Sequence, residues 1–117
     1  MSLNPAASMW AGFTASGASP QFELPTGGTL VGGVLLVSAL TAVSGSGGPT
    51  LTCYLDVLDA SGTFNQVIAL TAQSSAGVQT GTSSPLAVTA AAIGIYRLRW
   101  VISGTGQFVG ALVAISQ

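Results

Sequence analysis

Charged side chains are almost absent from this chain of 117 residues. It has two arginines, three acidic residues, no lysine and no histidine, so charged residues make up 4% of the sequence, against about 25% in an average soluble domain. Without histidine, a Ser-His-Asp or Cys-His catalytic arrangement cannot form. Without lysine, neither a Schiff base nor a P-loop can form. We therefore expect a protein that is not an enzyme.

The sequence also contains few residues that could bind a metal, a cofactor or a nucleic acid. A single cysteine, Cys53, excludes an internal disulfide and a cysteine-rich zinc site. Two arginines, Arg97 and Arg99, cannot neutralise a run of phosphates, so nucleic-acid binding is not expected. Asp56 and Asp59 have an odd spacing that sends strand side chains to opposite faces, which predicts a solvated strand residue and a turn former. We expect neither a metal nor a cofactor.

No segment has the pattern of a targeting signal or a membrane span. Residues 1–26 contain no basic residue, and a secretory signal begins with basic residues. The uncharged stretch 27–43 lies at the short end of the about 17–25 residues that cross a bilayer. It also contains four glycines and lacks flanking basic anchors. We expect a buried β-strand there, and the shorter apolar stretch 86–95 is interpreted in the same way.

Apolar and small residues dominate what remains. Apolar residues make up 49% of the chain, and glycine, serine and threonine account for more than a third of it. Clusters of glycine, proline and serine separate short runs rich in valine, leucine, isoleucine and aromatic residues. Short strands separated by frequent turns are typical of an all-β sandwich or barrel. The frequent glycines leave no room for a long helix.

Alternation of apolar and polar residues locates three strands. Residues 50–71 are predicted to form a β-hairpin, with Cys53 on its inward face as a small core residue. In the stretch 95–102, four side chains share the face expected in the core, and Arg97 and Arg99 lie on the opposite face, where they pair at the sheet surface or between subunits. The four core side chains are Tyr96, Leu98, Trp100 and Ile102. Residues 107–116 are apolar on both faces, so we expect the sandwich or another subunit to cover both.

The first residues of the chain leave two alternatives open. Trp10 and Phe13 either stack on a sugar or a partner, or pack as the first strand. We expect residues 1–12 to form an N-terminal arm that reaches a neighbouring subunit, and residues 13–117 to form the β-sandwich domain. The candidate interface residues are Trp10, Phe13, Arg97, Arg99 and Phe108.

Three motifs carry a resemblance to a known family. They are TASGASPQFEL from Thr14, ALTAVSGSGGPTLTCYLDVLDASGTFNQVIALT from Ala39, and YRLRWVISGTGQFVGALVAIS from Tyr96. Over about 100 residues the chain resembles small β-sandwich virion proteins of tailed bacteriophages. The resemblance implies a jelly-roll-like antiparallel sandwich of about eight strands. It implies a role as a capsid decoration or other head-surface protein, present in the host cytoplasm before assembly.

The low charge also predicts self-association. Contiguous exposed apolar surface usually marks an interface, and closed symmetry buries such surface without forming filaments. The resemblance favours a trimer, because a capsid lattice offers three-fold positions, and it implies the major capsid protein as a partner. The alternative is a tail or fibre protein whose sandwich binds host glycan, for which Trp10 and Tyr54 are the candidate platform residues. Neither alternative involves nucleic acid or a membrane.

Overall fold

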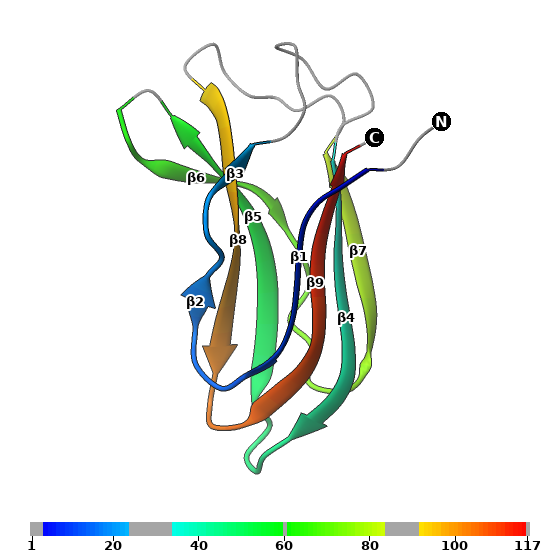
Figure 1. Ribbon diagram of the computed structural model, residues 1–117. Helices are drawn as coiled ribbons and strands as arrows, with labels where there is room; N and C mark the ends of the chain where they lie inside the picture. Colours follow the sequence, from blue (N-terminus) through cyan, green and yellow to red (C-terminus); the bar gives the residue numbers. More distant parts are fainter. Residues whose placement is uncertain (1–3, 24–33, 60, 84–91, 117) are drawn as a thin grey trace.

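The computed structural model describes residues 4–23, 34–59, 61–83 and 92–116, which form two antiparallel sheets packed face to face and contain no helix (Figure 1). The predicted all-β sandwich is therefore confirmed. The first sheet has the strand order β1-β9-β4-β7, and in the second sheet β2 and β3 both pair with β8, followed by β5 and β6. The strands are β1 (Asn4–Phe13), β2 (Gly17–Ala18), β3 (Phe22–Glu23), β4 (Val34–Ser44), β5 (Thr50–Asp59), β6 (Phe64–Ala69), β7 (Gly77–Ser83), β8 (Ala92–Ser103) and β9 (Gln107–Ser116).

The strand pairing is that of a jelly roll. If β2 and β3 are counted as one interrupted strand, the first strand pairs with the last, the second with the last but one, and so on inward to β5 and β6. Successive pairs fall alternately into the two sheets. A long hairpin rolled on itself produces this arrangement, and rolling places consecutive strands such as β8 and β9 in different layers.

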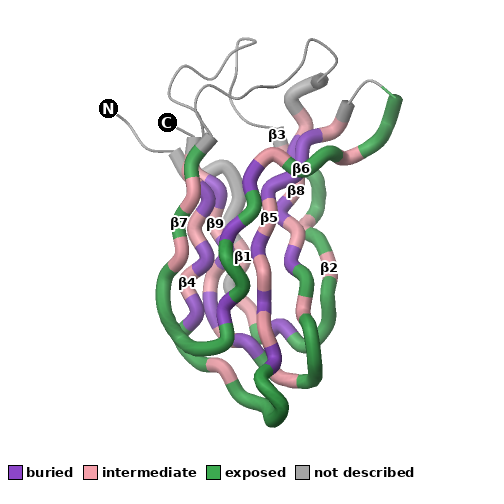
Figure 2. The backbone as a smooth tube through the Cα atoms, turned by 180° about the vertical axis from the view of Figure 1, so that it is seen from behind, coloured by how far each residue is buried: buried purple, intermediate pink, exposed green. Residues whose placement is uncertain are grey.

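The core lies between the sheets and follows the predicted alternation. Buried and half-buried residues alternate along β4, β8 and β9 (Figure 2). The face of β8 predicted to be internal is confirmed, since Tyr96, Leu98 and Trp100 are buried and Ile102 packs against them. The buried apolar side chains are Phe13, Leu36, Leu40, Leu51, Cys53, Leu55, Val57, Ile68, Leu70, Tyr96, Leu98, Trp100, Phe108, Leu112 and Ala114.

A close approach of two backbones fixes one glycine in β9. A Cβ atom on Gly110 would lie 2.2 Å from the carbonyl oxygen of Ala39 in β4. The register of the two strands shifts beside this point, between Leu40 and Ala42. Any larger residue at position 110 would push β4 and β9 apart, because backbone atoms cannot move aside as a flexible side chain can.

A buried polar link joins the two sheets. Ser38, on the inward face of β4, donates a hydrogen bond of 2.5 Å to Oε1 of Gln73. The backbone of Gln73 exchanges two hydrogen bonds with Leu51 of the other sheet, and its Nε2 donates to the carbonyl oxygen of Gly77. Because the residues around Ser38 in β4 are apolar, the sequence did not predict this hydrogen bond. The Ser38 hydroxyl has a partner, as buried polar groups normally do.

Two expectations about chain organisation need correction or restriction. Residues 4–12, predicted as an arm, belong to β1, which pairs along its length with β9 of the same chain. Of the apolar stretch 27–43, residues 34–43 lie in β4 as expected, and the part before residue 34 lies outside the described residues. β8 likewise begins at Ala92, so residues 86–91 are not described. No helix capable of crossing a membrane occurs in the part of the chain that the structure describes.

Candidate interaction faces

The charged residues are confined to one of the two sheets. Glu23 is in β3, Asp56 and Asp59 are in β5, and Arg97 and Arg99 are in β8. These strands belong to the same sheet, and the chain has no other charged residue. The sheet formed by β1, β9, β4 and β7 therefore contains no charge at all.

The outer surface of that sheet is largely apolar, and we call it the uncharged face. Its side chains form three rows across β9, β4 and β7, because directly opposed residues of neighbouring strands point to the same side. Val78 is 67% exposed, and the outward valine, leucine and isoleucine side chains of β4 and β9, such as Val37 and Ile115, are half-buried. The rows are Ala111–Ala39–Val78, Val113–Val37–Thr80 and Ile115–Leu35–Thr82.

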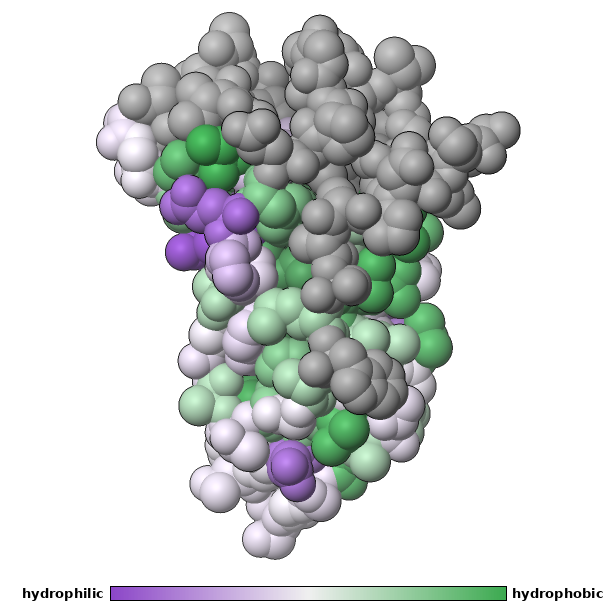
Figure 3. Space-filling view, in the orientation of Figure 1, coloured by the Kyte–Doolittle hydropathy of each residue, from purple (hydrophilic) through white to green (hydrophobic). Residues whose placement is uncertain are grey.

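Figure 3 shows the hydropathy of the surface in the orientation of Figure 1. The described atoms on the side shown are mostly white to green, and strongly hydrophilic residues are confined to small areas. The sandwich covers one face of β9 as predicted, and cover of the other face by a second subunit stays a prediction. The inward side chains of β9, such as Phe108 and Leu112, are fully buried, but its outward ones, such as Val113, stay half-exposed in a single chain.

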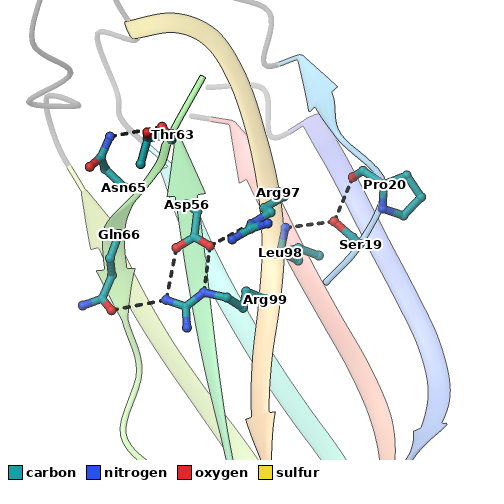
Figure 4. A network of polar contacts seen from close by, with 9 residues as sticks. All are labelled: Ser19, Pro20, Asp56, Thr63, Asn65, Gln66, Arg97, Leu98 and Arg99. Atoms are coloured by element: carbon teal, nitrogen blue, oxygen red, sulfur yellow. Dashed lines mark hydrogen bonds and ion pairs between the residues drawn. The ribbon is translucent and has the colours of Figure 1, made fainter. Parts of the chain in front are cut away.

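The opposite sheet has a compact ion-pair network on its outer surface (Figure 4). Oδ2 of Asp56 accepts hydrogen bonds from Nε of Arg97 at 3.0 Å and from Nε of Arg99 at 2.8 Å. Oδ1 of Asp56 accepts a third bond from an Nη atom of Arg99 at 3.2 Å, and the same nitrogen donates to Gln66 at 3.4 Å. These bonds raise the pKa of Arg99 above its usual value. Arg99 therefore stays protonated around neutral pH.

Each guanidinium group of this network also stacks on an aromatic ring. Arg97 lies 4.1 Å from the centre of the Phe64 ring, and Arg99 lies 4.1 Å from the centre of the Tyr54 ring. These distances are within the range of cation–π attraction. We call this group the arginine cluster; it comprises Asp56, Arg97, Arg99, Tyr54 and Phe64.

The arginine cluster corrects the prediction for Asp56. The carboxylate was expected to be solvated, but its side chain is only 3% exposed, whereas those of Arg97 and Arg99 are 30% and 27% exposed. The alternation had assigned Asp56 correctly to the outer face. Burial arises because the two arginines of the neighbouring strand lie over it. Asp59 occupies the end of β5, and its side chain is outside the description.

Residues 14–19, which we call the TASGAS segment, include β2 and are bound to the edge of β8 opposite β5. The backbone N–H groups of Leu98 and Ile102 donate to the hydroxyls of Ser19 and Ser16 at 2.9 and 2.8 Å. The indole N–H of Trp100 donates to the carbonyl oxygen of Ala15 at 2.9 Å. Serine hydroxyls thus satisfy strand donors that would otherwise need a backbone partner.

The predicted interface residues do not form one surface. Phe13 and Phe108 are 4% and 0% exposed, so they are corrected to core residues: their rings fill the space between the sheets and have no surface left for a partner. Trp10 lies in β1 opposite Ala111, and its side chain is outside the description. Arg97 and Arg99 meet on the outer face of the other sheet.

Cys53 is the core residue that the sequence predicted, and its burial has a measurable consequence. It is 1% exposed, and desolvation raises the pKa of its thiol to about 12. The unfolded chain loses this proton near pH 8.5, so the folded state alone retains it above that pH. We expect the free energy of unfolding to fall by about 1.4 kcal/mol per pH unit between pH 9 and 12 from this group.

Urea titrations at pH 8, 9.5 and 10.5 measure this effect. Cys53→Ala serves as the matched variant, because it removes the thiol and should flatten the pH dependence. Tyr96, whose pKa is also raised by burial, is present in both proteins and therefore cancels in the comparison. A slope that is the same in both proteins would contradict the burial of the thiol.

No group of histidine, cysteine, aspartate or glutamate residues suited to a metal occurs within the described ranges.

Among solved structures, the chain is similar to the C-terminal family 22 carbohydrate-binding module of Xyn10B from Clostridium thermocellum. The TM-score is 0.53 and the identity 13%, over 97% of this chain and 84% of the module. At this identity the similarity shows the sandwich fold alone.

The chain is also similar to part of a structure of infectious bursal disease virus, Gx strain. Here the TM-score is 0.42 and the identity 14%, over 95% of this chain and 33% of the viral one. No family model and no curated protein sequence matches the chain.

Proposed function

We propose that this protein is a non-enzymatic structural component of a bacteriophage particle. It decorates the capsid surface, where it associates with copies of itself and with the major capsid protein. The observation that carries this proposal is the confinement of every charge to one sheet. The resemblance of the three sequence motifs to phage head-surface proteins supplies the particle as the setting.

The uncharged face suits assembly for an energetic reason. Burying an ion costs several kcal/mol unless it is well paired, and this face has no ion to bury. Its valine, isoleucine and leucine side chains gain about 25 cal/mol for each Å² of apolar surface removed from water. Contacts between copies and with the capsid would bury this apolar surface and add contact area that holds the shell together. Before assembly, the charged sheet would keep the free protein soluble.

The decoration role is tested on particles of the phage that encodes this chain. We expect quantitative mass spectrometry of purified particles to find the protein in a fixed ratio to the major capsid protein. We expect electron microscopy with labelled protein to place it on the head. Absence from the particles would refute the proposal, and a location on the tail would support the fibre-type alternative instead.

Self-association is expected to depend on the uncharged face and to give a trimer. Val78 and Thr80 are both exposed, so replacing both with aspartate should leave the single chain folded. We expect light scattering after size-exclusion chromatography to show an oligomer for the wild type. For the Val78→Asp/Thr80→Asp variant we expect the 11.5 kDa monomer.

Ser46→Asp/Ser75→Asp is the matched control, since it adds the same charge at exposed positions in the connections outside the strands of this face. It should associate like the wild type. A wild-type protein that is monomeric at micromolar concentration would contradict self-association. A dimer would contradict only the three-fold assignment.

The glycan-binding alternative has less support from the described side chains. A sugar platform needs an open aromatic face, and the guanidinium group of Arg99 lies over the Tyr54 ring at 4.1 Å. Phe64 is covered by Arg97 in the same way. The similarity to a carbohydrate-binding module concerns the fold, so it does not offset this observation.

A further inference from the structure

The arginine cluster has more hydrogen-bond donors than its own residues use. A guanidinium group carries five N–H bonds. Arg97 donates through Nε to Asp56, and among the described residues nothing accepts from its Nη atoms. Arg99 donates through Nε and one Nη atom, and its other Nη atom likewise has no acceptor in the described part of the chain. These Nη groups lie on side chains that are partly exposed.

The cluster also has an excess of positive charge. Two guanidinium cations share a single carboxylate, Asp56, whose two oxygens already accept three hydrogen bonds. One positive charge therefore has no counterpart within the cluster. An anion bound to the Nη groups of Arg97 and Arg99 would balance this charge without displacing any existing contact.

The donors are held in place before any ligand arrives. Asp56 fixes each guanidinium from one edge, and Phe64 and Tyr54 support them from one face. β8 lies inside its sheet, with β5 on one side and β2 and β3 on the other. Side chains fixed in this way lose little conformational entropy on binding, which favours affinity.

We propose that the arginine cluster is a docking site for a carboxylate of a second protein, the side chain of an aspartate or glutamate. The paired N–H groups of Arg97 match the two oxygens of a carboxylate, and Arg99 adds a further donor beside them. A protein carboxylate is favoured over an acidic sugar because both aromatic rings of the cluster are covered by guanidinium groups. The inference holds for any protein partner and does not depend on the proposed place in the particle.

The test follows the arginine side chains by NMR in the full-length, ¹⁵N-arginine-labelled protein. The probe is the blocked peptide acetyl-Gly-Glu-Glu-Gly-amide at constant ionic strength, and acetyl-Gly-Gln-Gln-Gly-amide is the uncharged control. We expect a saturable shift of the Arg97 and Arg99 Nε–H signals with the glutamate peptide only. Arg97→Lys, which keeps the charge but loses the fork, should bind roughly ten-fold more weakly, equivalent to about 1.4 kcal/mol.

Three results would overturn the inference. The first is a wild-type protein whose arginine signals do not move. The second is tighter binding of galacturonate than of the peptide, which would assign the site to acidic sugars. The third is binding only after Glu23→Gln and Asp59→Asn, which would show that a carboxylate of the same chain fills the site. Far-UV circular dichroism of Arg97→Lys confirms that the variant is folded.

Discussion

Replacing Trp100 by alanine is expected to lower the free energy of unfolding by about 3–5 kcal/mol. Trp100 is 8% exposed and lies between the two sheets. Its ring centre is 4.9 Å from that of Phe13 in β1, at a tilted angle. The substitution removes a large buried side chain and leaves a cavity that the rigid strands cannot close.

Besides creating a cavity, Trp100→Ala removes the contacts of the indole with the TASGAS segment. The indole N–H of Trp100 holds the carbonyl oxygen of Ala15, and the ring lies so close to Gly17 that a Cβ there would be 3.0 Å from it. Without the indole, the TASGAS segment loses one of its bonds to β8 and keeps those of Ser16 and Ser19. We therefore expect Trp100→Phe, which keeps an aromatic ring but not the N–H, to recover only part of the stability.

Urea unfolding followed by far-UV circular dichroism measures both variants. Arg97→Ala is the control on the same strand, since Arg97 faces outward and Asp56 keeps its two bonds from Arg99. Its loss should stay below about 1 kcal/mol. Equal losses for Trp100→Ala and Arg97→Ala would mean that the two faces of β8 are assigned wrongly.

Alternation within one strand was enough to predict which side chains face the core. It placed Leu98 and Trp100 inside and Arg97 and Arg99 outside, and the structure confirms this. The rule works because successive side chains of any strand point to opposite sides. It needs no knowledge of which strand lies next to which.

Features that depend on pairing between distant strands could not be predicted in this way. Asp56 is buried because Arg97 lies opposite it and Arg99 opposite Tyr54, and this register is set by the whole sheet. The first strand was taken for an arm because its partner, β9, is at the other end of the chain. The separation of charge between the sheets is also invisible in the sequence, since β8 and β9 are consecutive yet belong to different layers.

Removing the carboxylate of Asp56 should have an effect nearly as large as the loss of Trp100. In Asp56→Ala, Arg97 and Arg99 keep their positive charges side by side and lose three hydrogen bonds. Breaking a fully buried ion pair in this way costs about 3–5 kcal/mol. The arginines are about a third exposed, so water relieves part of the repulsion. We expect the free energy of unfolding to fall by about 2–4 kcal/mol.

Two further variants separate charge from packing in this network. Asp56→Asn keeps the shape and one acceptor oxygen, so it should cost less than Asp56→Ala. Asp56→Leu combined with Arg97→Leu and Arg99→Met removes all three charges, and an apolar replacement of a whole ion-pair network is often neutral or better. We expect the triple variant to be more stable than Asp56→Ala in urea unfolding. If Asp56→Ala instead costs less than about 1 kcal/mol, the network behaves like an ordinary surface ion pair, and its arginines are then not fixed in place.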